Sequence, residues 1–273
     1  MEQPARRTVI ALLIGILLAL LLGEVLLGRF DPLGFGYFRD QADLNPHLVP
    51  DPRGYTFAPG TYRLSKSTFT ILPDGNRAVP DTVPSAKKTL VFMGDSVTFG
   101  YGVSDDQTWV DLVARDLPDV YVINAGVSGF NSTNVLRTLA LYPAAQTLVY
   151  LIINNDAAPE NRPNFGHLRP APALSWLEVY LLNLPNYLFP AADEPNDLPR
   201  YFADLRQINA DGRVLLVAFD EDFSRMTIRE CCTVSLIERG TDRVSPADGH
   251  PGVRGNQEIA QQMLRLLRVR FGL

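Results

Sequence analysis

The stretch "KTLVFMGDSVTFGYG" (88–102) decides the fold prediction, because an unbroken apolar run ends abruptly in Gly-Asp-Ser. Strands that are buried on both faces of a parallel sheet read as continuous apolar runs of this kind. We therefore expect a strand over 88–93. Ser96 would follow its carboxyl end at a strand-to-helix turn, with a glycine on either side.

Strands and helices alternate along the rest of the chain. Apolar runs at 120–124, 147–153 and 213–219 predict three more strands. Helical spacing is found in 106–117, in 131–142 and in the last segment, 251–270, which has a proline in its first turn. This alternation predicts a mostly parallel sheet with helices on both faces and right-handed crossovers.

Polar and small residues stand where the predicted strands end. These positions are 94–96 (Gly-Asp-Ser), 125–129 (Ala-Gly-Val-Ser-Gly) and 154–156 (Asn-Asn-Asp), joined by 248–250 (Asp-Gly-His) before the last helix. Ligands of open parallel sheets gather at the carboxyl ends of the strands. We therefore expect these residues to converge on one edge of the sheet.

Together these residue types can carry out acyl transfer. Ser96 would be the nucleophile, and a serine hydroxyl needs a base to take its proton. His250 is the best candidate base, and Asp248 is the nearest acid that could orient its imidazole. The backbone N–H groups of Ser96 and Gly129 and the side-chain amide of Asn155 could donate to an oxyanion.

Several other roles stay open at these positions. Asp248 could merely cap the last helix, and Asn154 competes for the amide role. Asp95 is expected to be structural, binding loop amides. The other two histidines are poor candidates for the base, because His47 lies in an exposed lead-in and His167 in a long insert.

These motifs resemble those of the SGNH, or GDSL-type, hydrolases. "GDSVTFGYG" (94–102) is similar to the first block of that family and "NAGVSG" (124–129) to the second. "NND" (154–156) is similar to the third block and "DGHPGVRG" (248–255) to the last. The α/β-hydrolase motif G-x-S-x-G does not fit, since Thr98 stands in its fifth position. The resemblance covers about 88–156 and 211–270.

The resemblance implies a flavodoxin-like, three-layer α/β/α sandwich with a central sheet of about five strands. It also implies esterase, lipase or carbohydrate-deacetylase activity without a cofactor. In this family the catalytic roles would fall on Ser96, His250 and Asp248, and the oxyanion donors would include Gly129 and Asn155. Two departures are visible: Ile153 replaces the usual glycine of the third block, and the last block reads D-x-H where D-x-x-H is common.

The first thirty residues contain a long apolar segment. Thr8 to Leu27, at 1.5 Å per residue, matches in length a hydrocarbon core about 30 Å thick. Arg6 and Arg7 precede it, and Glu24 is its only charge. We expect an uncleaved signal anchor with its arginines in the cytoplasm and the bulk of the chain outside the membrane. A cleaved signal peptide or a buried helix are the alternatives.

The predicted organisation has three parts: the anchor (1–30), a linker with a small β-rich lead-in (31–86), and the hydrolase domain (87–273). An insert at 157–200, rich in proline and aromatics, interrupts the domain. Its apolar part, 174–189, is expected to pack over the site or to face the membrane.

Composition narrows the partners. The net charge of −5 and the lack of a long basic run argue against a nucleic-acid partner. No Cys/His spacing indicates a metal site. The two neighbouring cysteines, Cys231 and Cys232, are expected to be unbonded, because adjacent cysteines rarely form an unstrained disulfide.

Three functions remain from the sequence. The preferred one is a membrane-tethered serine esterase, acting on a small-molecule or glycan ester such as an O-acetylated surface glycan. An O-acyltransferase using the same residues is a close variant. A catalytically silent domain that binds a glycan or a partner is the competing class, favoured by Ile153 and by the D-x-H spacing.

Overall fold

The centre of the molecule is a five-stranded sheet with the strand order β6-β5-β7-β8-β9. The computed structural model describes residues 3–159, 175–189, 196–223 and 231–272. Every neighbouring pair in this sheet is parallel. The order reverses between β5 and β7, as in flavodoxin-like folds. The strands are β5 (Lys88–Met93), β6 (Val120–Asn124), β7 (Thr147–Ile152), β8 (Val214–Phe219) and β9 (Ser235–Ile237).

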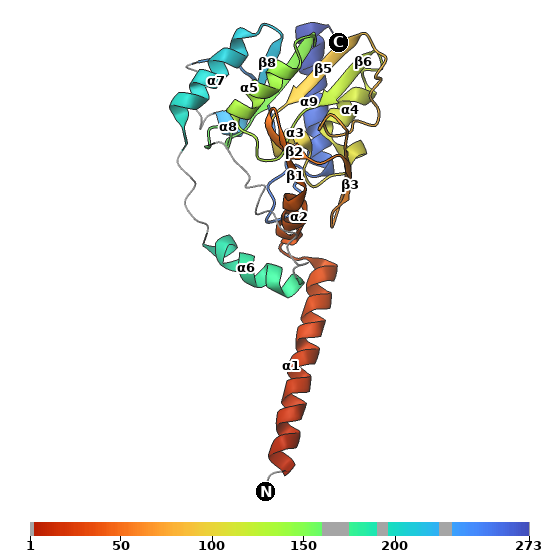
Figure 1. Ribbon diagram of the computed structural model, residues 1–273, viewed down its shortest axis with the longest axis vertical. Coiled ribbons are helices and arrows are strands. Elements are labelled where there is room, and N and C mark those ends of the chain that lie inside the picture. Colours follow the sequence, from red (N-terminus) through yellow and green to blue (C-terminus); the bar gives the residue numbers. More distant parts are fainter. Residues whose placement is uncertain (1–2, 160–174, 190–195, 224–230, 273) are drawn as a thin grey trace.

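Helices cover both faces of the sheet, so the predicted three-layer architecture is confirmed (Figure 1). Helices α4 and α9 pack on one face and α5 and α7 on the other. Alternate residues of each strand serve the two cores: Val149 and Leu151 of β7 join the first, and Tyr150 joins the second. The helices are α4 (Trp109–Arg115), α5 (Ser132–Leu141), α7 (Leu198–Ala210) and α9 (Val253–Phe271).

Four of the five strands lie where the apolar runs predicted them. The fifth, β9, has only three residues and forms no apolar run, so its sequence gave no signal. The helix predicted over 106–117 is shorter than expected. Thr108 has an extended backbone (ψ 145°), which separates a 3-10 turn, Asp105–Gln107, from α4, and its side chain caps α4 by accepting the N–H of Asp111.

The lead-in, residues 31–86, packs against the end of β6 and against the turn that begins at Ser96. Its Arg77 N–H donates to the carbonyl of Asn124 (3.2 Å), and the buried Arg77 guanidinium donates to the carbonyl of Phe99 (2.7 Å) and pairs with Asp105 (2.9 Å). The lead-in contains a helix and two antiparallel hairpins. These elements are α2 (Gly36–Leu44), a 3-10 turn (Asn45–His47), β1 (Leu48–Asp51), β2 (Gly54–Phe57), β3 (Gly60–Arg63) and β4 (Thr68–Ile71).

Helix α1 (Gln3–Phe30) projects away from the sheet as a single rod (Figure 1). Its stretch Thr8–Phe30 has 23 residues, and an 18-residue window within it has a mean hydropathy of 2.9 and no buried residue. By length and composition this helix can cross a membrane, although a signal sequence has the same properties. The exposure of its side chains argues against the alternative of a buried core helix.

Only parts of the predicted insert 157–200 belong to the described residues. Helix α6 (Trp176–Leu188), with Pro185 in its last turn, forms most of the apolar segment 174–189. It packs against α1 and α2 rather than against the sheet. Residues 160–174, which include His167, and residues 190–195 lie outside the described residues.

The expectation of two unbonded cysteines is wrong: Cys231 and Cys232 form a disulfide just before β9. The expectation followed from their Cα separation of 3.8 Å, which is below the usual range of about 4.4–6.8 Å for disulfides. Here the bond is made between neighbours despite that short separation.

Candidate active site

Ser96 begins a single helical turn, α3 (Ser96–Phe99), that follows β5. Asp95 caps this turn, because its carboxylate accepts the N–H of Val97 at 2.9 Å. Gly94 has φ +152°, and a Cβ at that position would stand 2.4 Å from Oγ1 of Thr98. The serine is thus held on a sharp, almost fully buried turn at the carboxyl end of a central strand.

The segment that follows β6 packs against the turn that carries Ser96. Gly126 follows β6, and a Cβ there would stand 2.5 Å from the backbone nitrogen of Phe99 and 2.8 Å from the carbonyl carbon of Thr98. Its N–H donates to the side chain of Asn124 (3.1 Å). A glycine is needed at 126 because two backbone segments touch there, and not because of its φ angle.

A chain of hydrogen bonds joins Ser96 to His250 and Asp248. The Nε2 atom of His250 lies 2.7 Å from Oγ of Ser96, and its Nδ1 atom lies 2.5 Å from Oδ1 of Asp248. The same Oδ1 atom accepts the backbone N–H of His250 (3.0 Å), so the D-x-H spacing forms a compact turn before α9. The contact between Asp248 and His250 therefore forms with the D-x-H spacing and does not require D-x-x-H.

Asp95 also contacts the serine hydroxyl. Its Oδ2 atom accepts from Oγ of Ser96 at 2.8 Å. A hydroxyl has one proton, so Ser96 donates to either Asp95 or His250 at a given moment. Burial raises the pKa of Asp95, while the N–H of Val97 and the serine hydroxyl oppose that rise. Asp95 is therefore a cap for α3 that also touches the reactive oxygen.

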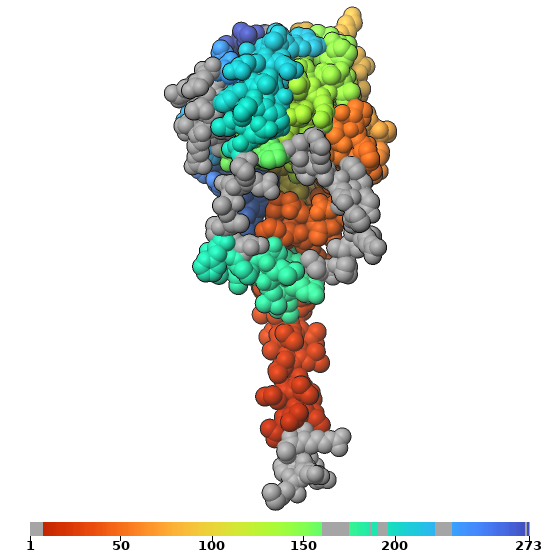
Figure 2. Space-filling view, turned by 60° about the vertical axis from the view of Figure 1, so that its left-hand side comes forward, coloured from red at the N-terminus to blue at the C-terminus, as the bar shows by residue number. Residues whose placement is uncertain are grey.

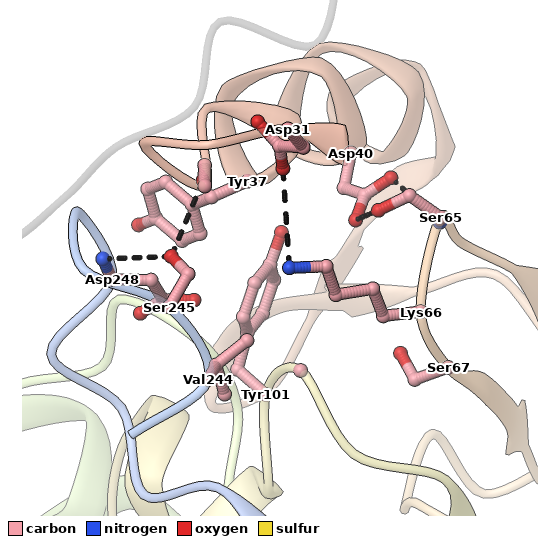
Figure 3. A pocket seen from close by; sticks show the side chains of 12 residues that line it. Asp31, Tyr37, Asp40, Ser65, Lys66, Ser67, Tyr101, Val244, Ser245 and Asp248 are labelled. Atoms are coloured by element: carbon pink, nitrogen blue, oxygen red, sulfur yellow. Dashed lines mark hydrogen bonds and ion pairs between the residues drawn. The ribbon is translucent and has the colours of Figure 1, made fainter. Parts of the chain in front are cut away.

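Two tyrosines flank the imidazole. The ring centroids of Tyr37 and Tyr101 lie 5.9 and 5.2 Å from that of His250. Both tyrosines line a small cavity with Asp248 and Ser245 (Figure 3). Burial, followed by the charge of Asp248, raises the pKa of Tyr37 to about 12, and burial also raises the pKa of Tyr101. Both rings are thus neutral walls beside the imidazole at ordinary pH.

The loop that carries Asp248 and His250 is held from two sides. The backbone N–H of Asp248 donates to Oγ of Ser245 (3.1 Å), and that hydroxyl donates to the carbonyl of Gly34 (3.3 Å). The N–H of Ala247 donates to the carbonyl of Leu33 (3.1 Å). The segment that directly follows α1 therefore positions Asp248, as Figure 3 shows for Ser245.

The predicted oxyanion donors lie in turns at two other strand exits. Gly129 is exposed and has φ +81°, a conformation that favours glycine. Asn154 and Asn155 are both exposed in the turn after β7. Asp156 fixes this turn, because its Oδ2 atom accepts from the hydroxyl of Tyr150 (2.7 Å) and from the N–H of Ile153 (3.0 Å).

The remaining candidates are placed elsewhere or absent from the described part of the chain. His47 lies in the lead-in with its ring 5.1 Å from that of Tyr62. Within the described residues, no group of three or more His, Cys, Asp and Glu side chains could hold a metal ion.

Sequence reasoning missed the tyrosines and the loop contacts. Tyr37 and Gly34 come from the lead-in, more than 200 positions before His250, and no motif marks them. Tyr101 was visible, because it lies within the first quoted block, 94–102. An aromatic residue at that place is also common in a core, so the sequence did not distinguish the two roles.

No family model matches the sequence, and no curated protein matches it. Several solved structures do. A member of the lipolytic G-D-S-L family from Veillonella parvula is 14% identical, with a TM-score of 0.42, 67% of this chain and 100% of that chain being covered. A carbohydrate acetylesterase family member from Sinorhizobium meliloti is 17% identical, with a TM-score of 0.40 and coverage of 68% and 100%.

An acetyl xylan esterase from the rumen bacterium Butyrivibrio proteoclasticus is 14% identical, with a TM-score of 0.40 and coverage of 70% of this chain and 65% of that chain.

Proposed function

We propose that the chain is a serine ester hydrolase that is tethered to a membrane by α1, with its catalytic domain on the extracytoplasmic side. The observation that carries this proposal is the continuous hydrogen-bond chain from Ser96 through His250 to Asp248. An alcohol, an imidazole and a carboxylate in this order are the components of nucleophilic acyl transfer.

The geometry supports a two-step reaction. With Nδ1–H of His250 donating to Asp248, Nε2 is free to accept the proton of Ser96 while Oγ attacks the ester carbonyl. The imidazolium then gives this proton to the departing alkoxide. The alcohol leaves, and the acyl group remains bound to Oγ of Ser96. The same imidazole next takes a proton from water, and the resulting hydroxide adds to the acyl carbon. The bond between that carbon and Oγ then breaks, the imidazolium returns the proton to Oγ of Ser96, and the acid is released. Asp248 stabilises the imidazolium in both steps.

The oxyanion would be bound by the N–H groups of Ser96 and Gly129 and by the Asn155 amide. In support, the N–H of Gly129 and the Asn155 side chain donate to no acceptor in the described part of the protein. Removing one such donor commonly costs 10²–10³-fold in kcat. Replacing Asn155 by alanine should cost about that much, whereas the same change at Asn154 should have little effect.

The substrate we propose is an ester at the cell surface, with an O-acetylated glycan as the first class to test. The anchor supports this, because it would hold the site close to the membrane. An acyltransferase would use the same residues and would differ in having an acceptor alcohol, in place of water, resolve the acyl-enzyme. The D-x-H spacing no longer favours a catalytically silent domain, because it permits the contact between Asp248 and His250.

Hydrolysis of p-nitrophenyl acetate by the full chain in detergent tests the proposal. Ser96→Ala should lower kcat by at least about 10³-fold. Ser85→Ala, at an exposed serine in a turn, is the matched control and should keep full activity. A fluorophosphonate probe should label the peptide that contains Ser96. Equal background rates for the wild type and Ser96→Ala, without labelling, would remove the esterase proposal.

A further inference from the structure

Helix α6 presents a large apolar surface to solvent. We call it the outer face of α6. The side chains of Leu181, Leu182 and Phe189 are 72%, 62% and 78% exposed. A contiguous apolar patch on a water-facing surface usually marks a contact with a membrane or a partner. The outer face consists of Leu181, Leu182, Leu184 and Leu188, together with Phe189, which directly follows the helix.

The opposite face of α6 is fixed to the segment that follows α1. Val179 and Tyr180 are buried against Phe35. The hydroxyl of Tyr180 donates to Asp31 (2.8 Å) and accepts the N–H of Leu33 (3.1 Å). These contacts set the rotation of α6 about its own axis, so the outer face cannot turn inward while they are present.

The first turn of α6 is joined to α1 itself. The two carboxylate oxygens of Glu24 accept the N–H groups of Trp176 (2.8 Å) and Leu177 (3.0 Å). The Trp176 ring approaches Gly28 so closely that a Cβ there would stand 2.8 Å from it. Glu24, the only charge between Thr8 and Leu27, therefore caps the first turn of α6 from a fixed position along α1.

That depth is the end of the apolar stretch. Glu24 and Gly28 lie within about 10 Å of Phe30, at 1.5 Å per residue. In a bilayer spanned by Thr8–Phe30 this is the region between the hydrocarbon core and the headgroups. Helix α6 has 13 residues, too few to span, and it runs across the direction of α1 (Figures 1 and 2).

We propose that α6 is an interfacial helix, with its outer face inserted among the lipids of the leaflet next to the catalytic domain. The proposal rests on the membrane tether of the proposed function. The occupant is the lipid surface, because the exposed surface of α1 is continuous with α6 through Glu24 and Trp176. Helices of this kind bury an apolar face by about 5–10 Å at the headgroup boundary.

The membrane would contact the protein at two places, α1 and the outer face of α6, and together these two contacts would set the orientation of the catalytic domain. A single rod leaves the domain free to turn about the rod, whereas α6 fixes which side of the domain faces the lipids. The loop that holds Asp248 is bonded to Leu33 and Gly34, directly beyond α1. The catalytic edge of the sheet is thereby held toward the bilayer, where an ester carried by the membrane surface would meet it.

Depth-dependent fluorescence quenching in liposomes tests this. Full-length Leu182→Cys, Leu17→Cys and Val269→Cys are each labelled with the environment-sensitive fluorophore NBD, without reductant. They are then reconstituted with phosphatidylcholine that carries a nitroxide on its acyl chain. Leu17 is an exposed position of α1, and Val269 is 88% exposed on α9, far from α1 in Figure 1. Hydrolysis of p-nitrophenyl acetate by each variant checks that it is folded.

We expect at least threefold more quenching at position 182 than at position 269, close to the quenching at position 17. Quenching at 182 as weak as at 269, with strong quenching at 17, would overturn the interfacial helix and leave the tether intact. Weak quenching at all three positions would overturn the tether and this proposal with it. The esterase proposal is judged separately, from the hydrolysis rates.

Discussion

Replacing Gly126 by alanine should damage the reaction without touching any catalytic group. The new Cβ would stand 2.5 Å from the backbone nitrogen of Phe99, whereas ordinary contacts begin at 3.4 Å. The two backbones must therefore separate by about 0.9 Å. Phe99 belongs to the one-turn helix that begins with Ser96, so the displacement is passed to the serine.

The size of the effect follows from the hydrogen bond that the displacement breaks. Oγ of Ser96 lies 2.7 Å from Nε2 of His250, and a shift of about 0.9 Å takes this pair out of hydrogen-bonding range. A misplacement of about 1 Å costs on the order of 100-fold in rate. We expect that loss in kcat, together with about 1–3 kcal/mol of stability lost to overpacking.

The assay is hydrolysis of p-nitrophenyl acetate by the full chain, with thermal unfolding measured in parallel. Gly212→Ala is the matched control, because nothing lies within 4 Å of its added Cβ. It should keep wild-type kcat and unfold at the wild-type temperature. A Gly126→Ala enzyme with kcat within threefold of wild type would refute the reasoning, as would an equal loss in Gly212→Ala.

Three other changes probe the groups around the site. Asp248→Asn should lower kcat by about 10⁴-fold, because an amide no longer holds the imidazole of His250 in the required tautomer; a loss under tenfold in steady-state kinetics would contradict this. Arg77→Met should lower the free energy of unfolding in urea by about 3–5 kcal/mol, because it leaves the half-buried Asp105 without its cation and three backbone carbonyls without their donor; a change below 1 kcal/mol would show that the pair is dispensable. Burial raises the pKa of Asp111 to about 6, above its ordinary 3.8, so the folded state holds this proton more tightly than the unfolded state. The stability from this group is therefore full below about pH 4, falls as pH rises to about 6 and is constant above; Asp111→Asn should remove that fall, and parallel melting curves of the two proteins at pH 4.5 and 7.5 would argue against it.

Much of the fold could be predicted because the central strands are buried on both faces. A strand such as 147–152 must be apolar throughout to serve two cores, and that requirement is legible in the sequence. β9 could not be predicted, because an edge strand of three residues needs no such run. The disulfide between Cys231 and Cys232 was missed for a different reason: a general rule on Cα spacing did not hold for this pair.

The candidate site could be predicted only where its residues lie next to predicted strands or helices. Ser96 directly follows β5 and His250 lies just before α9, and the structure brings them to 2.7 Å. The walls of the site were not legible, because Tyr37 and Gly34 reach it from the far end of the chain through packing that no local pattern records. The role of Glu24 was equally hidden, since its partners belong to a helix about 150 positions away.

The segment from Asp31 to Tyr37 both connects α1 to the domain and forms part of the candidate site. It supplies the carbonyls that fasten the acid–base loop and one aromatic wall beside the imidazole. Proteolytic cleavage just before Asp31 would separate the domain from α1 and leave these contacts in place. A cut ten residues later would remove these contacts, so a released form of the domain would have to begin near Asp31 to keep them.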